Sequence, residues 1–110
     1  MNLIVMLFVC AQEKAGRLAQ QLIEQRLAAC VDILPSSLNL LGWRPDSFER
    51  GQATLLITTN DELTDGVVES LKAGGAWESE RAAVVCLEIK QSYSSYIKWA
   101  EGSLMEGEDF

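Results

Sequence analysis

The stretch QRLAACVDILP, residues 25–35, lies where one hydrophobic periodicity gives way to another. Before it, apolar residues recur at three- and four-residue steps with polar residues between them, which predicts an amphipathic helix from residue 13 to about residue 29. Within it, Val31 and Ile33 alternate with their neighbours, which predicts that a strand begins at Cys30. The stretch therefore predicts a helix that leads directly into a strand of the sheet on which it docks.

On both sides of this stretch, the chain alternates between strand and helix patterns. A continuous apolar run at the N-terminus is typical of a buried strand and is too short for a membrane span. Proline, aspartate and serine in residues 44–47 predict a turn that joins two later strands into a hairpin. The first predicted strand covers residues 3–10, and the second covers residues 30–34 and resumes at residues 38–43. The remaining strands are predicted at residues 53–59 and 82–89, and two further helices at residues 63–73 and 93–101.

Several residues predict where these elements bend, begin or end. Pro35 cannot donate to a β-ladder, so it predicts a bend or bulge in the second strand. The segment Thr59–Glu62 matches a capping box for the middle helix, with Asn60 as an alternative cap. Gly74–Gly75 is expected to end that helix, and Gly102 to end the last one.

The order of these elements predicts an α+β fold, namely a ferredoxin-like βαββαβ sandwich with a short C-terminal helix. Right-handed crossovers place the first two helices on one face of the sheet. Because 48% of the residues are apolar, we expect another subunit to cover the other face. We expect one domain over residues 1–104 and a disordered acidic tail over residues 105–110.

The composition limits the possible classes of function. A net charge of −7 without a basic patch argues against binding to nucleic acid or to an anionic membrane. The absence of histidine removes the commonest general base and excludes Ser-His-Asp and Cys-His catalysis, so we expect no enzyme. The three cysteines are widely spaced without a CxxC motif, which favours reduced thiols in a cytoplasmic protein over disulfides or structural zinc.

Four features together resemble the CutA family of divalent-cation tolerance proteins. They are the RLAAC run of Arg26–Cys30, a strand ending in Pro35, a hairpin tip with Trp43, and the YIKW helix of Tyr96–Trp99. The likeness extends over residues 3–104 with almost no gaps. It implies a ferredoxin-like subunit of a tight homotrimer, related to the PII signalling fold, whose inter-subunit clefts bind small ligands.

The chain also departs from the family pattern. The family's histidine–proline–tyrosine segment and the proline–glutamate pair after it are replaced here, and a lysine at the hairpin tip is replaced by Asp46. Copper or mercury binding in the family is linked to a cysteine that aligns with Cys10 and to histidines that align with Ala76 and Trp77. Of these ligands only Cys10 remains, so the resemblance implies a degraded metal site.

The candidate site residues follow from these observations. Cys10 is the one tentative metal ligand, for copper or another divalent metal ion, and a buried small side chain is the alternative. Cys30 and Cys86 are expected to serve packing alone, Cys30 where the helix docks on the sheet and Cys86 inside an apolar strand. An inter-subunit cleft would be lined by Asp32, Trp43, Trp77 and Glu78.

Two functions from different classes remain open. The first is a CutA-like trimer associated with tolerance of divalent metal ions such as copper. The alternative is a PII-like sensor that binds a small molecule in the cleft between subunits, in which the altered residues 76–83 and the hairpin tip form a new pocket.

Overall fold

The computed structural model describes residues 2–40, 48–75 and 84–104. The predicted cleft residues Trp43, Trp77 and Glu78, and the predicted tail 105–110, lie outside the described residues. The elements follow the predicted order and are β1 (Leu3–Ala11), α1 (Gln12–Glu24), β2 (Cys30–Leu40), β3 (Phe48–Asn60), α2 (Thr64–Ala73), β4 (Val84–Glu88) and α3 (Ser94–Ser103).

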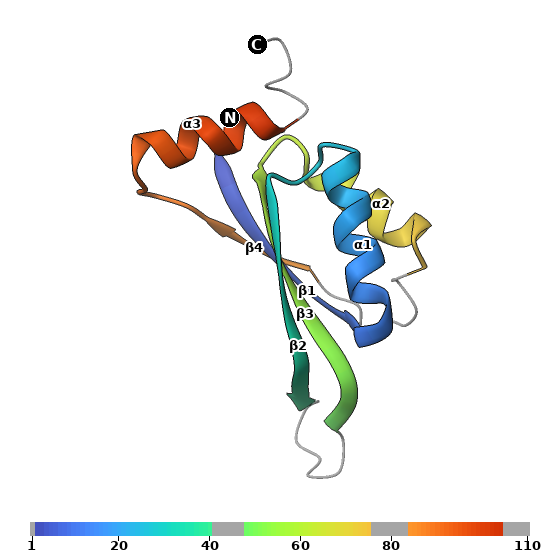
Figure 1. The fold of residues 1–110 in the computed structure, drawn as a ribbon. Coiled ribbons are helices and arrows are strands. Elements are labelled where there is room, and N and C mark those ends of the chain that lie inside the picture. Colours follow the sequence, from blue (N-terminus) through green and yellow to red (C-terminus); the bar gives the residue numbers. More distant parts are fainter. Residues whose placement is uncertain (1, 41–47, 76–83, 105–110) are drawn as a thin grey trace.

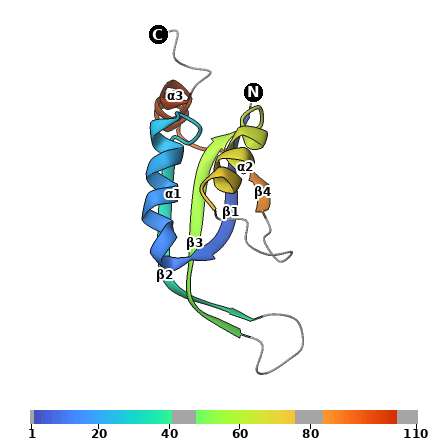
Figure 2. The ribbon, with the colours of Figure 1, turned by 90° about the vertical axis from the view of Figure 1, so that its right-hand side faces the viewer.

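The four strands form one antiparallel sheet in the order β2-β3-β1-β4. Helices α1 and α2 cover one face of this sheet, and α3 lies across one end of the sheet on the other side (Figure 1). The β2–β3 hairpin extends well beyond the two helices (Figure 2). This is the predicted ferredoxin-like arrangement, with both crossover helices on one face.

The core lies between the sheet and the two crossover helices. Met6 and Phe8 of β1 stand opposite Ile57 and Leu55 of β3, and all four side chains are fully buried. They pack with apolar residues of both helices, which include Ala15, Leu18, Leu22, Val67 and Leu71. Alternate residues of β1 are only partly buried, because they point to the opposite face of the sheet.

The second strand has the predicted irregularity. The pairing of β2 with β3 shifts in register between Leu34 and Ser37, and again between Ser37 and Asn39. Pro35 lies within the first shift, as expected for a residue without an amide hydrogen. A bulge at this point bends the paired strands and increases their twist.

The first helix ends earlier than predicted, at Glu24 instead of near residue 29. The amide of Arg26 donates to the carbonyl of Ile23, and the amide of Leu27 donates to that of Leu22. These two bonds form a Schellman motif, in which the position that usually holds glycine is here Arg26 with φ 58°. Because arginine rarely adopts this conformation, the sequence did not indicate this helix end.

The middle helix begins within one residue of its predicted start, but the predicted cap is wrong. Helix α2 begins at Thr64, and no side chain in the described part of the chain caps it. The Thr59 hydroxyl donates to the carbonyl of Leu27 at 2.6 Å, and Asn60 Oδ1 accepts from the amide of Glu62 at 2.8 Å. Both side chains are therefore used to join β3 to its neighbouring turns. Asn60 Nδ2 is buried, and it has no hydrogen-bond partner among the described residues.

The glycine predictions had mixed outcomes. Gly75 adopts φ 78° directly after α2, as expected for a glycine that ends a helix. Gly102, in contrast, lies inside α3. In the part of the chain that the structure describes, no helix is long and apolar enough to cross a membrane.

Candidate metal and ligand sites

Cys10 lies near the end of β1, on the face of the sheet covered by the helices. It pairs with Ala53 of β3, and only 4% of its surface is exposed. Burial raises the pKa of its thiol, and the charge of Lys14 opposes this effect. Within the described residues, no group of three or more cysteine, histidine or carboxylate side chains is arranged to hold a metal ion. Cys10 therefore offers one soft ligand and not a complete site.

Next to Cys10, three polar side chains of α1 bind the end of α2. Lys14 Nζ donates to the carbonyl of Gly75 at 3.0 Å, and Arg17 Nη2 donates to that of Gly74 at 3.0 Å. Gln21 Nε2 donates to the carbonyl and the hydroxyl of Ser70 at 2.9 and 2.8 Å. The two cations meet the negative end of the α2 dipole, so they fix the point at which the chain leaves α2.

Asp32 is exposed on β2 and pairs with Leu56 of β3. Cys30 precedes it by two residues and points to the same side, so the Cys30 Sγ lies 3.8 Å from Asp32 Oδ2. Cys30 is half-buried and lies on the side of the sheet away from α1, because it pairs with Thr58, whose neighbour Ile57 points into the core. The prediction that Cys30 fills the contact between helix and sheet is therefore wrong.

Cys86 is exposed, although its strand has the composition of a buried one. It pairs with Met6, while its neighbours Val85 and Leu87 point to the opposite face and are each 50% exposed. Strand β4 lies at the edge of the sheet, and four of its five residues are exposed. The expected burial of Cys86 inside an apolar strand is not found in the isolated subunit.

The predicted site residues do not form one cluster. Cys10 is opposite Ala53 and Asp32 is opposite Leu56, and these two β3 residues point to opposite faces of the sheet. The Cys10 thiol therefore lies under the helices, whereas the Asp32 carboxylate lies on the opposite face of the sheet. The other predicted cleft residues lie outside the described residues.

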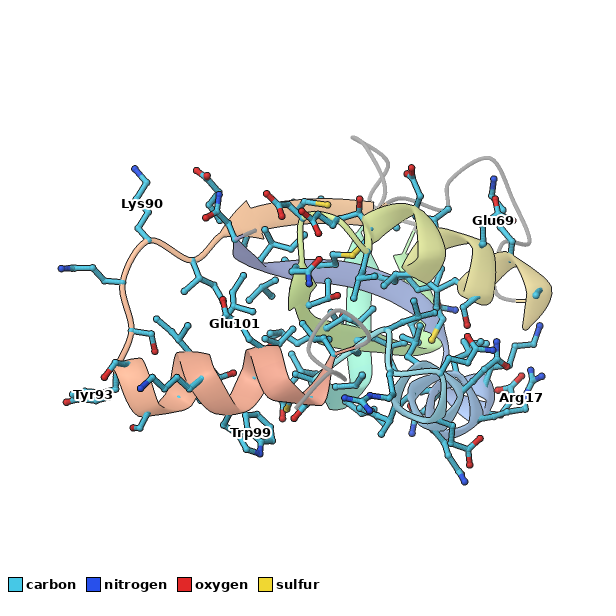
Figure 3. All side chains as sticks on the ribbon, turned by 90° about the horizontal axis from the view of Figure 1, so that it is seen from above. Arg17, Glu69, Lys90, Tyr93, Trp99 and Glu101 are labelled. Atoms are coloured by element: carbon cyan, nitrogen blue, oxygen red, sulfur yellow. The ribbon has the colours of Figure 1, made fainter. Side chains whose placement is uncertain are left out.

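The face of the sheet away from α1 and α2 is apolar, and we call it the open face. Its most exposed apolar residues are Leu34, Val85 and Leu87, and its partly exposed ones are Val5, Leu7, Val9 and Leu56. Beside this face, helix α3 carries two aromatic rings, Tyr96 and Trp99, whose centroids lie 5.8 Å apart. Trp99 is 53% exposed and points away from the sheet (Figure 3). A contiguous apolar surface of this kind is a common feature of interaction faces.

A contact that the sequence did not indicate anchors α3. The guanidinium of Arg26 donates through Nη2 to the carbonyls of Gly102 and Leu104, at 2.9 and 3.1 Å. It joins the turn after α1 to the C-terminal end of α3, 76 residues later. The only trace of this contact in the sequence is the arginine itself, because its partners are backbone atoms.

The fold defines a class of small ferredoxin-like subunits, here with a buried cysteine near the end of β1 and one largely open apolar face. The model of the CutA1 divalent ion tolerance protein family matches residues 3–103. The chain therefore belongs to the CutA1 divalent ion tolerance family.

Individual relatives agree with this assignment. The crystal structure of CutA1 from Oryza sativa is 30% identical, covers 96% of both chains and superposes with a TM-score of 0.83. The CutA1 structure from Thermus thermophilus is 26% identical, with a TM-score of 0.79 over 93% of this chain and 98% of that one. A curated divalent-cation tolerance protein CutA of T. thermophilus is 29% identical over 90% of this chain and 94% of its own length.

Some of the relatives are much longer than this chain. The match covers 58% of the length of the chloroplastic CutA 1 protein of O. sativa and 50% of that of the mouse CutA protein. The chain thus spans about half the length of these two curated relatives.

Proposed function

We propose that this protein is a homotrimer that acts in the tolerance of divalent metal ions, copper first among them, and that it does so in the cytoplasm without catalysing a reaction. The observation that carries this proposal is the family match over residues 3–103, whose members are named for divalent ion tolerance. The absence of histidine from the sequence supports a role in binding over one in catalysis.

The apolar character of the open face supports the proposed assembly into a homotrimer. Leu34, Val85 and Leu87 are about half exposed in the isolated subunit, and partly exposed side chains of β1 lie between them. Strands β2 and β4 form the two edges of the sheet and, among the described residues, each lacks a strand partner on its outer side. Exposed edges and an apolar face together favour association with further copies of the chain.

The metal part of the proposal rests on Cys10, whose thiolate would be the soft ligand for monovalent or divalent copper. We expect copper to bind to the native protein and this binding to be lost in Cys10→Ser, as measured by calorimetry under reducing conditions. Because burial raises the pKa of Cys10, copper must compete with a proton, and its affinity should rise with pH. Cys86→Ser is the matched control, since it removes an exposed thiol.

The outcome of this titration separates the metal part of the proposal from the assembly. If the native protein binds no copper at any pH at which it stays folded, the direct metal role is removed and a trimeric scaffold remains.

Tolerance itself is measured as growth of the host over a range of copper concentrations after deletion of the gene. Restoration by the native gene and by Cys86→Ser, but not by Cys10→Ser, is the expected result.

A small-molecule sensor is the second candidate. The observation in its favour is that Asp32, the one predicted cleft residue within the described part of the chain, is exposed on the open face. A carboxylate beside an apolar surface suits recognition of a polar ligand between subunits. A thermal-shift screen against a metabolite panel tests this candidate. Stabilisation that Asp32→Asn abolishes would favour it over the metal role.

A further inference from the structure

The first half of α3 is exposed over most of its surface. Tyr93, which precedes the helix, is 85% exposed, and residues 94–99 are all exposed apart from Ile97, which is partly buried against the core. The buried residue of the helix is Ala100, in its second half, and Leu104 directly after the helix is buried too. Figures 1 and 3 agree with this, because the N-terminal end of α3 extends away from the sheet. The subunit therefore holds α3 mainly by its second half.

The sequence of this first half is a poor helix former. With 10 residues, α3 is shorter than the length of about 12–15 residues below which an isolated helix is marginal in water. Apart from Lys98, residues 94–99 are serine, tyrosine, isoleucine and tryptophan, which favour a helix less than alanine or leucine does. The first turn holds no acidic residue, and no side chain of the described residues caps it. The first half therefore depends on contacts beyond those that the described residues supply.

The opposite end of α3 is fixed by polar contacts as well as by burial. The Arg26 guanidinium donates to the carbonyls of Gly102 and Leu104. Where α3 lies across the sheet (Figure 1), the paired residues Leu3 and Asn60 are 5% and 0% exposed, although they point to the same face as the half-exposed residues of β4. This end of α3 therefore stays attached to the subunit whether or not the first half is helical.

The position of the first half favours a second copy of the chain as the molecule that covers it. Helix α3 lies on the same side of the sheet as the open face (Figure 1). Strand β4, whose Val85 and Leu87 are each 50% exposed on that face, leads through residues 89–93 to the start of α3. A copy that covers the open face therefore also comes to lie beside the first half of α3. Tyrosine and tryptophan side chains, which α3 exposes there, are enriched in such contacts.

We propose that residues 94–99 fold into a helix only when a second copy of the chain covers them. This inference rests on the homotrimer of the proposed function. The helix in the structure is then the assembled form of this segment, and separation of the subunits melts it. Because Arg26 keeps the end of α3 on the subunit, assembly has to order the first half alone. That ordering lowers the affinity of the subunits for one another.

Hydrogen exchange of the α3 amides, with sedimentation of the same samples, tests the proposal. The amide of Ile97 donates to the carbonyl of Tyr93 at 3.1 Å, so its exchange reports on the first turn. Leu87→Lys, on β4, is used to separate the subunits. In this variant the amides of residues 97–99 should exchange at least about tenfold faster than in the assembled native protein, since a frayed segment opens with a free energy near zero. The amides of β1 should stay protected in both proteins, which shows that the subunit remains folded.

Ile23→Lys is the matched control, because it adds the same charge on α1, away from the open face, and should leave α3 as protected as in the native protein. Val85→Lys, at the other 50% exposed position of β4, should behave as Leu87→Lys does. Equal protection of residues 97–99 in assembled and separated subunits would overturn the inference and leave the homotrimer standing. A native protein that sediments as a monomer at every concentration would overturn the homotrimer and the inference together.

Discussion

Leu87→Lys is expected to dissociate the proposed homotrimer into folded subunits. Leu87 is 50% exposed on the open face, so a lysine there is tolerated in the isolated subunit. In an assembly that buries this face, the ammonium would be desolvated without a partner, at a cost of several kcal/mol. Since each 1.4 kcal/mol is a factor of ten, the dissociation constant should rise about a hundredfold or more. Sedimentation velocity over a concentration series measures this change.

The control for this variant is Ile23→Lys. Ile23 is 43% exposed, which is similar to Leu87, but it lies on α1, on the other side of the sheet. The same chemical change there should leave the assembly intact. A Leu87→Lys protein that sediments as the native protein does would show that the open face is not the interface. Dissociation by both variants would point to a general loss of stability.

The second large effect is expected at Arg26. Arg26→Ala removes both hydrogen bonds to the end of α3 and leaves a left-handed backbone position without a compensating contact. A hydrogen bond from a charged group contributes about 1.5–3 kcal/mol, so we expect a loss of about 2–3 kcal/mol in the free energy of unfolding. Urea denaturation at a fixed protein concentration measures it, because assembly makes the stability depend on concentration.

Arg26→Gly separates the two contributions. Glycine loses the same hydrogen bonds but accepts φ 58° without the cost of about 1–2 kcal/mol that other residues incur. We therefore expect Arg26→Gly to be about 1 kcal/mol more stable than Arg26→Ala and still less stable than the native protein. Hydrogen exchange should show faster opening of α3 in both variants. Equal stability of the alanine and glycine variants would contradict the Schellman assignment.

The order of elements could be predicted from the sequence because it depends on local periodicity. The strands of the sheet core and the amphipathic helix before QRLAACVDILP have patterns that tertiary contacts reinforce. The bulge at Pro35 could be predicted for the same reason, since a missing amide hydrogen is a property of the residue itself.

The element ends were harder to predict, because they depend on contacts between distant residues. Arg26 occupies a glycine position, and its side chain binds backbone carbonyls of α3 that are far away in the sequence. Thr59 matched a capping box, but its hydroxyl binds the carbonyl of Leu27. In both cases a tertiary hydrogen bond overrides the local preference.

The burial of the cysteines shows a further limit. An apolar segment such as β4 has the same composition whether a helix or another subunit covers it. Cys86 and Cys30 were therefore expected to be packed within the subunit, and they lie instead at an exposed edge strand and on the open face. Cys10, on the covered face, is the one cysteine that is buried within the subunit.

The central claim is that the open face of this subunit is buried between three copies of the chain. The molar mass of the native protein in solution, measured by light scattering at micromolar concentration, tests it most directly. A mass close to three times the subunit mass of 12.1 kDa is the predicted result. A mass of one subunit over the whole concentration range would contradict the claim, and with it any site that depends on a cleft between subunits.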